Sequence, residues 1–77
     1  MQQIEFRLDR GDYVQLNQLL KLVGLADSGG AGKALVATGA VRVDGQVELR
    51  KTAKIRAGQT VTCGDAEIRV LGGVKSE

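Results

Sequence analysis

The chain has 77 residues and a mass of 8.1 kDa, which limits it to one domain with a single thin core. No stretch approaches the roughly 20 apolar residues that cross a bilayer, and the N-terminus lacks the basic and apolar runs of a secretory signal. The one cysteine, Cys63, cannot form an internal disulfide, so a reducing, cytoplasmic location is expected.

The formal net charge of +2 is unevenly distributed along the chain. Residues 33–56 hold six basic and two acidic residues, a balance of +4, whereas the remainder holds five basic and seven acidic residues, a balance of −2. A basic segment on a slightly acidic body favours a localised anionic partner, although composition alone leaves solvated surface charge as an equal alternative. The basic candidates are Lys33, Arg42, Arg50, Lys51, Lys54 and Arg56.

The N-terminal segment has the alternating pattern of a half-buried strand. Ile4, Phe6 and Leu8 are apolar, and the residues between them are charged. Residues 9–12 contain a glycine and predict a turn, with Asp12 as a cap for the element that follows.

Two helices are expected next. Leucines and a valine recur at three- and four-residue spacing, which predicts an amphipathic helix over residues 13–23, ended by Gly24 in a left-handed conformation. Asp27 or Ser28 can cap a second helix, which Gly39 ends, and the short connection makes the two helices packed neighbours. The buried side of the second helix is expected to include Ala31, Ala34, Leu35 and Thr38.

A hairpin follows the second helix. Asp44 and Gly45 both tolerate positive φ, and they stand between apolar runs at residues 41–43 and 46–49. Residues 50–57 are expected to be irregular, with one clear anchor to the core at Ile55. A second hairpin is expected to turn at Gly64-Asp65. Val61 and Cys63 share one strand face before the turn, and Ala66, Ile68 and Val70 share another after it.

The order of these elements predicts an α+β fold in which two packed helices cover one face of a small, mainly antiparallel sheet. Residues 1–71 are expected to form one domain and residues 72–77 a flexible tail, because the tail has little to bury.

The glycine-rich stretch at residues 29–33 invites comparison with a phosphate loop, which it fails. Asp27 stands where the first glycine is required, and Ala34 stands where a hydroxyl would hold magnesium. A nucleotide site is therefore not expected. The glycines have two remaining explanations: close approach of an RNA backbone to a helix N-terminus, or a tight contact between the helices.

Catalysis has few candidate groups. The chain has no histidine, and Cys63 falls on an inward strand position without an activating partner. Turn formation and solubility account for the carboxylates Asp44, Asp65 and Glu67, and one thiol without histidine gives zinc no credible ligand set. We therefore expect no enzyme activity, no cofactor and no metal site.

The basic residues are the strongest candidates for binding. Arg42 points away from the face that its valine neighbours share, and the other cations lie on the second helix or downstream of the hairpin. Aromatic residues are scarce, with only Phe6 and Tyr13, so stacking of bases along a single strand is not expected. Recognition of folded RNA by shape and backbone fits this composition better.

Five short segments together carry a resemblance to a known family. They are Leu16-Asn17-Gln18-Leu19-Leu20, Gly24-Leu25-Ala26, Lys33-Ala34-Leu35-Val36, Gly39-Ala40-Val41-Arg42-Val43-Asp44-Gly45 and Gly58-Gln59-Thr60-Val61. Over about residues 16–70 the chain resembles the RNA-binding domain of small-subunit ribosomal protein S-four, the alpha-L motif, and in particular its small stand-alone bacterial members. The resemblance implies a cytoplasmic protein that binds ribosomal, transfer or other structured RNA, with a target that the fold does not fix. A monomer is expected, because nothing in the sequence demands a larger assembly.

The same resemblance implies RNA contacts at Lys33 and Arg42, from the second helix and the hairpin. This chain departs from the family pattern at two cations. A frequent Arg-Leu-Asp appears as Gln15-Leu16-Asn17, and a frequent arginine early in the second helix falls at Gly29. These losses shift the expected contacts toward Arg50, Lys51 and Lys54, with Arg56 beside them. The alternative function is a protein-interaction adaptor that recruits a partner through Leu49, Ile55 or an exposed strand edge.

Overall fold

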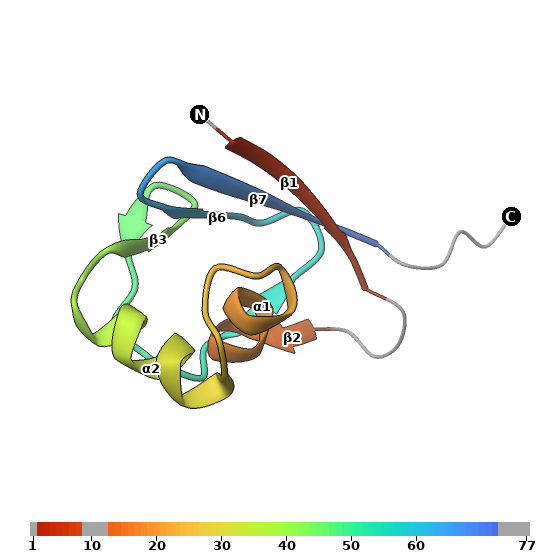
Figure 1. Ribbon diagram of the computed structural model, residues 1–77. Coiled ribbons are helices and arrows are strands. Elements are labelled where there is room, and N and C mark those ends of the chain that lie inside the picture. The colour runs from red at the N-terminus through yellow and green to blue at the C-terminus, as the bar shows by residue number, and fades with distance from the viewer. Residues whose placement is uncertain (1, 9–12, 73–77) are drawn as a thin grey trace, which may run out of the picture.

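The computed structural model describes residues 2–8 and 13–72. The turn predicted at residues 9–12, its cap Asp12, and residues 73–77 of the predicted tail lie outside the described residues. Neither helix in the described ranges is long and apolar enough to cross a membrane. In chain order the elements are β1 Gln2–Arg7, β2 Tyr13–Gln15, α1 Leu16–Leu22, α2 Gly29–Ala37, β3 Val41–Val43, β4 Gln46–Val47, β5 Lys54–Arg56, β6 Thr60–Cys63 and β7 Ala66–Leu71 (Figure 1).

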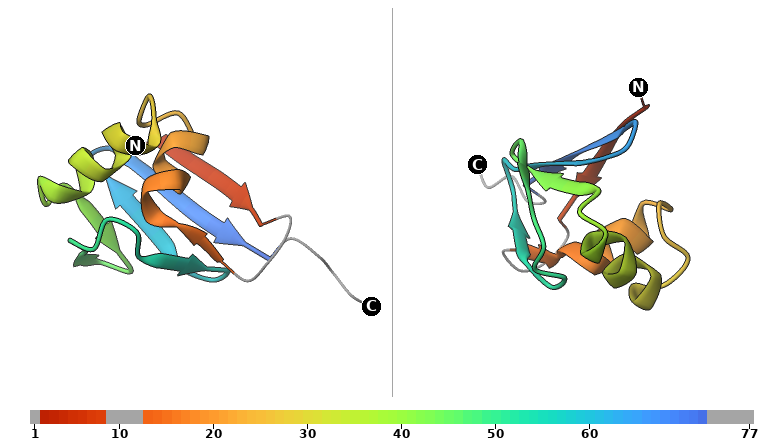
Figure 2. Two further views of the ribbon diagram at one scale, coloured as in Figure 1. Left: turned by 90° about the horizontal axis from the view of Figure 1, so that it is seen from below. Right: turned by 90° about the vertical axis from the view of Figure 1, so that its left-hand side faces the viewer.

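The strands form two sheets. A five-stranded sheet has the order β1-β7-β6-β3-β4, and a two-stranded sheet pairs β2 with β5. Every pair is antiparallel except β1 with β7, which runs parallel from Gln2 opposite Ala66 to Arg7 opposite Leu71. Both helices lie on the same side of the larger sheet, as the views in Figures 1 and 2 agree. The predicted α+β class, with two helices against a mainly antiparallel sheet, is confirmed.

The hairpin predicted at Asp44-Gly45 is present. The two residues have φ of 53° and 87°, the positive values that a type I′ turn requires at both central positions. Asp44 also ties this turn to β6, because its Oδ1 accepts a hydrogen bond from the Thr60 amide at 3.0 Å. The second strand of this hairpin is shorter than predicted, since β4 ends at Val47.

Two predictions of local structure were wrong, and one pairing explains both. Residues 13–15 are not the start of a helix but strand β2, and residues 54–56, expected to be irregular, are strand β5. Each strand is too short to show a pattern alone, and each gains its hydrogen bonds from the other. Their central residues, Val14 and Ile55, pair and face the core. Ile55 is the anchor predicted, and at 1% exposure it is closed to any partner protein.

The predicted buried face of α2 was also wrong. Ser28 caps the helix as expected, with its Oγ accepting from the Ala31 amide at 3.1 Å. The residues buried are Gly32 and Val36, however, whereas Leu35 is only half-buried. Of the face that was predicted to be buried, the exposed residues are Ala31, Ala34 and Thr38.

A close contact between the helices explains this rotation of α2. A Cβ atom added to Gly32 would lie 2.5 Å from the backbone oxygen of Asn17 in α1, so only glycine fits there. The closest approach of the two backbones, and not the most apolar stripe, therefore decides which side of α2 faces inward. Of the two explanations offered for the glycines, Gly32 shows the tight helix contact.

The core lies between α1 and the sheets. Gly24, with φ of 86°, ends α1 in the left-handed conformation expected of it. The side chains that α1 buries pack against the inward faces of both sheets, which joins the small sheet to the large one. The largest fully buried side chains are Leu16, Leu19, Leu20, Val36, Val41, Ile55, Val61, Ile68 and Val70.

Candidate nucleic-acid interface

Residues 50–56, here called the basic segment, are held against the start of α1 by hydrogen bonds between the two backbones. The amide of Leu16 donates to the carbonyl of Ala53 at 2.8 Å, and the amide of Asn17 donates to the carbonyl of Lys51 at 3.1 Å. The first amides of a helix have no partner within the helix, and no described side chain caps α1. The carbonyls of the basic segment bind two of these amides, which fixes the segment to the buried start of α1.

The far end of the basic segment forms the outer face of the small sheet. Pairing places Tyr13 opposite Arg56, and the inward direction of Val14 and Ile55 leaves their neighbours facing solvent. The Nζ atom of Lys54 lies 5.0 Å from the centroid of the Tyr13 ring, and the guanidinium carbon of Arg56 lies 5.8 Å from it. Two of the predicted cations are thus gathered around one aromatic ring.

The near end of the basic segment is partly neutralised by an acid. Arg50 donates from Nε to Oε2 of Glu48 at 3.0 Å and from a terminal nitrogen to Oε1 at 3.2 Å. These hydrogen bonds lower the pKa of Glu48 and raise the pKa of Arg50. The Arg50 side chain is still 81% exposed, and it lines one depression with Thr52, Ala53 and Lys54. Sequence reasoning did not anticipate this pairing, although the two residues are only two positions apart.

The other two predicted cations come from different elements. Arg42 on β3 lies on the face of the large sheet opposite that of buried Val41, and lines a separate depression with Thr62 and Gly64. Lys33 is exposed on α2. The structure therefore gathers Arg50, Lys51, Lys54 and Arg56 in one anchored segment and places Arg42 and Lys33 apart in the fold, on β3 and α2.

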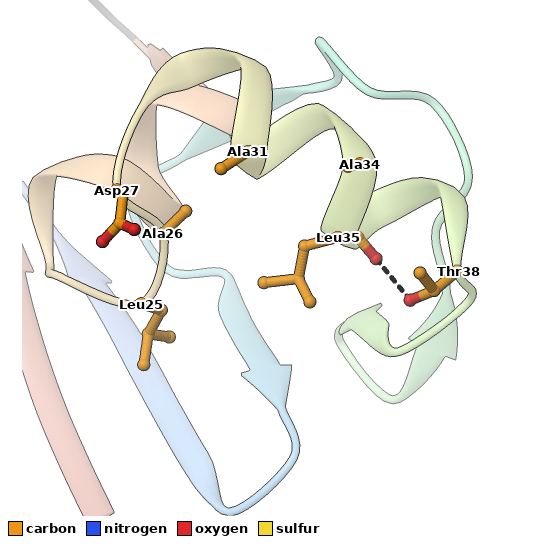
Figure 3. Close-up of a pocket in the computed structure, with 7 residues that line it drawn as sticks. All are labelled: Leu25, Ala26, Asp27, Ala31, Ala34, Leu35 and Thr38. Carbon is orange, nitrogen blue, oxygen red and sulfur yellow. Dashed lines mark hydrogen bonds between the residues drawn. The ribbon is translucent and has the colours of Figure 1, made fainter.

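A further pocket lies between α2 and the loop that precedes it (Figure 3). Because α2 turns Gly32 and Val36 toward the core, its opposite side stays open to solvent. Residues that were predicted to be buried therefore line this surface depression. Thr38 donates its hydroxyl to the carbonyl of Leu35 at 2.6 Å beside it. Among the described residues, those that line this pocket include one carboxylate and no cation. They are Leu25, Ala26, Asp27, Ala31, Ala34, Leu35 and Thr38.

The described groups offer little for catalysis or metal binding. Cys63 is half-buried on β6, and burial raises the pKa of its thiol, which disfavours the nucleophilic thiolate. Within residues 2–8 and 13–72, no group of three or more histidine, cysteine, aspartate or glutamate side chains is placed to hold a metal ion.

Comparison with known proteins places this arrangement in a family. Residues 6–71 match the S4 domain, and the chain belongs to the S4 domain family. It is 46% identical over 66 residues to YbcJ of Escherichia coli strain K12, a match that covers 86% of this chain and 94% of YbcJ, and equally to YbcJ of Shigella flexneri. The resemblance seen in the sequence is thereby confirmed.

A solved structure agrees with the sequence match. The solution structure of E. coli YbcJ is described as revealing an alpha-L motif involved in RNA-binding. It matches this fold with a TM-score of 0.68 at 45% identity, covering 87% of this chain and 85% of that one. The chain therefore has the alpha-L fold.

Proposed function

We propose that this protein binds structured RNA, such as ribosomal or transfer RNA, through the basic segment and catalyses no reaction. The observation that carries the proposal is the attachment of the basic segment to the start of α1, which presents its cations from a fixed backbone. The family supports it, since the solved structure of YbcJ is described as an RNA-binding alpha-L motif and YbcJ itself is provisionally named an RNA-binding protein.

The proposed mechanism is electrostatic contact with phosphates from a preorganised surface. Lys51, Lys54 and Arg56 meet the RNA backbone, with Arg50 contributing less because Glu48 already binds it. Each neutralised phosphate releases counterions, so for Z contacts the slope of log affinity against log salt is about −0.9Z for a duplex and about −0.7Z for a single strand. Arg42 and Lys33 extend the contact where the RNA folds around the domain.

A triple substitution tests this surface. Replacing Arg50, Lys51 and Lys54 together by alanine should weaken RNA binding and flatten its salt dependence, with thermal unfolding largely unchanged because all three side chains are exposed. The readout is the fluorescence anisotropy of a labelled ribosomal RNA fragment, titrated at several salt concentrations.

A matched control separates the segment from net charge. The control variant replaces three exposed cations outside the basic segment by alanine: Arg7, Lys21 and Arg69. It loses the same three charges as the test variant. The control variant should keep most of the affinity. Equal loss in both triple variants, or unchanged affinity in the folded test variant, would reject the basic segment as the binding surface.

Other parts of the proposal concern the setting of the domain. We propose that residues 1–71 act as one cytoplasmic, monomeric RNA-binding domain with residues 72–77 as a tail. Sedimentation with and without RNA tests the monomer, and cell fractionation tests the location.

A second candidate, a protein-interaction adaptor, is favoured by one observation. Val47 on β4 and Leu49 just beyond it are 51% and 60% exposed, at the edge of the large sheet. An exposed edge strand with apolar side chains is a site where another chain can add. Partners recovered in a pull-down after nuclease treatment would favour this function, and partners lost with the RNA would favour RNA binding.

A further inference from the structure

The exposed aromatic ring of Tyr13 is not explained by the core or by phosphate contact alone. Tyr13 is the only tyrosine of the chain and remains 40% exposed on the outer face of the β2–β5 sheet. Its neighbour Val14 makes the core contact of that strand, so the ring is not needed to hold β2 in place. The strand thus presents an aromatic surface to solvent.

The two cations at the ring mark this surface as suited to a nucleotide. Lys54 and Arg56 lie within the roughly 6 Å at which a cation is attracted to an aromatic ring. Neither forms a salt bridge with a carboxylate among the described residues, in contrast to Arg50. An aromatic face beside free cations is the combination that single-stranded nucleic-acid sites use, the ring for a base and the cations for its phosphates.

We propose that Tyr13 stacks on one unpaired base of the bound RNA while Lys54 and Arg56 hold the phosphates on either side of that nucleotide. This inference rests on the proposed function and deepens it. On binding, the flexible side chains of the two cations move from the ring to the phosphates, and the base takes their place on the ring. Base stacking is the stronger contact of the two, since cation–π attraction at an exposed site is weak.

The position of the ring fits the rest of the proposed surface. Lys54 contacts the ring and also lines the depression that Arg50 borders, so the stacking site is continuous with the phosphate-binding segment. One isolated ring can hold one base and not a strand. The RNA expected is therefore a folded one with a bulged or looped nucleotide next to a helix, which agrees with recognition of RNA by shape.

The test compares two RNA hairpins that differ in one group. The first carries a single bulged adenosine, and the second carries an abasic bulge at the same position, so the number of phosphates is equal. Anisotropy of a label on the RNA measures total binding at low salt. Stacking on one aromatic ring should make the wild-type protein bind the adenosine bulge between about fivefold and about a hundredfold more tightly.

Intrinsic fluorescence gives a second readout without any variant. Because the chain has one tyrosine and no tryptophan, its emission reports on Tyr13 alone. The adenosine bulge should quench this emission more than the abasic bulge does at equal saturation. Equal quenching at equal saturation would overturn the inference.

Substitutions at Tyr13 complete the design. Tyr13→Phe keeps the ring and should keep the preference for the adenosine bulge, whereas Tyr13→Leu keeps an apolar side chain and should lose it. Both folded variants should bind the abasic hairpin as the wild type does. Equal binding of the two hairpins by the wild type would reject the stacking site alone, whereas no binding of either hairpin would reject the proposed function with it.

Discussion

Glu48 determines how many cations of the basic segment are free of a carboxylate partner among the described residues. Its carboxylate accepts three hydrogen bonds from Arg50, including one from the backbone amide at 2.9 Å. Since these bonds lower the pKa of Glu48, the carboxylate stays ionised, and the pair intact, to a lower pH than an ordinary glutamate would allow. An exposed ion pair of this kind adds little stability. The main effect of the ion pair is to neutralise Arg50, one of the four cations of the segment.

Glu48→Gln should therefore strengthen RNA binding. Loss of the carboxylate charge frees Arg50 for one more phosphate, so the slope of log affinity against log salt should steepen by up to about 0.9. Salt titrations followed by anisotropy measure this change. Glu67→Gln makes the same change in net charge on β7, away from the basic segment, and should leave the slope unaltered. A slope that steepens equally in both variants would mean that only net charge matters.

Two glycines of α2, Gly30 and Gly32, differ in how much space surrounds them. The backbone of Asn17 occupies the space that a Cβ atom on Gly32 would need. A Cβ atom on Gly30 would have room, because its nearest neighbour would be Oγ of Ser28 at 3.8 Å. Both positions would gain from the better helix propensity of alanine. Only at Gly32 does the added methyl group force two backbones apart.

The two alanine variants should consequently change stability in opposite directions. Gly32→Ala should lower the free energy of unfolding by about 1–3 kcal/mol, because α2 must move away from α1. Gly30→Ala should raise the free energy of unfolding by up to about 1 kcal/mol. Urea denaturation of both variants measures the difference. Equal stabilisation by both substitutions would show that the helices do not approach as closely as the structure has them.

Elements with a strong local pattern could be predicted from the sequence, and elements created by a distant partner could not. The alternation in β1 and the Asp44-Gly45 pair follow from side-chain period and backbone preference, and both are present. Strands β2 and β5 are three residues each and exist because they pair with each other. The inward side of α2 follows from a backbone contact at Gly32, which a count of apolar residues cannot detect.

The same distinction holds for the candidate site. The four cations of the basic segment all fall within residues 50–56, so their clustering could be predicted. Tyr13 could not be associated with Lys54 and Arg56, because residues 13–15 have no local sign of a strand and pair across a long sequence separation. Nor could the separate positions of Arg42 and Lys33 be foreseen, since these depend on how the sheet and α2 are oriented.

At the scale of the whole molecule, Ile55 joins the small sheet to the common core. Its side chain is fully buried with Leu16, Val61 and Val70, although it belongs to the segment that carries the proposed binding cations. The proposed binding surface is therefore attached to the core through the Ile55 side chain. A change at Ile55 should affect both.

Ile55→Ala should lower the free energy of unfolding by about 2–5 kcal/mol, the cost of a cavity in a core. Leu49→Ala removes a similar apolar side chain that is 60% exposed, and should change stability by no more than about 0.5 kcal/mol. Urea denaturation of the two variants provides the comparison. A similar loss of stability in both variants would contradict the different burial of these two side chains.

The parallel pairing of β1 with β7 has a consequence for biosynthesis. Of the described strands β1 is synthesised before the others, but its only hydrogen-bonding neighbour in the described sheet is β7, which is synthesised after them. A nascent chain that stops before residue 66 can form both helices and the β3–β4 hairpin while Ile4 and Phe6 still lack a surface to join. Closing so long a loop is slower than forming a hairpin. The parallel pairing that covers β1 therefore has to wait for the synthesis of residues 66–71.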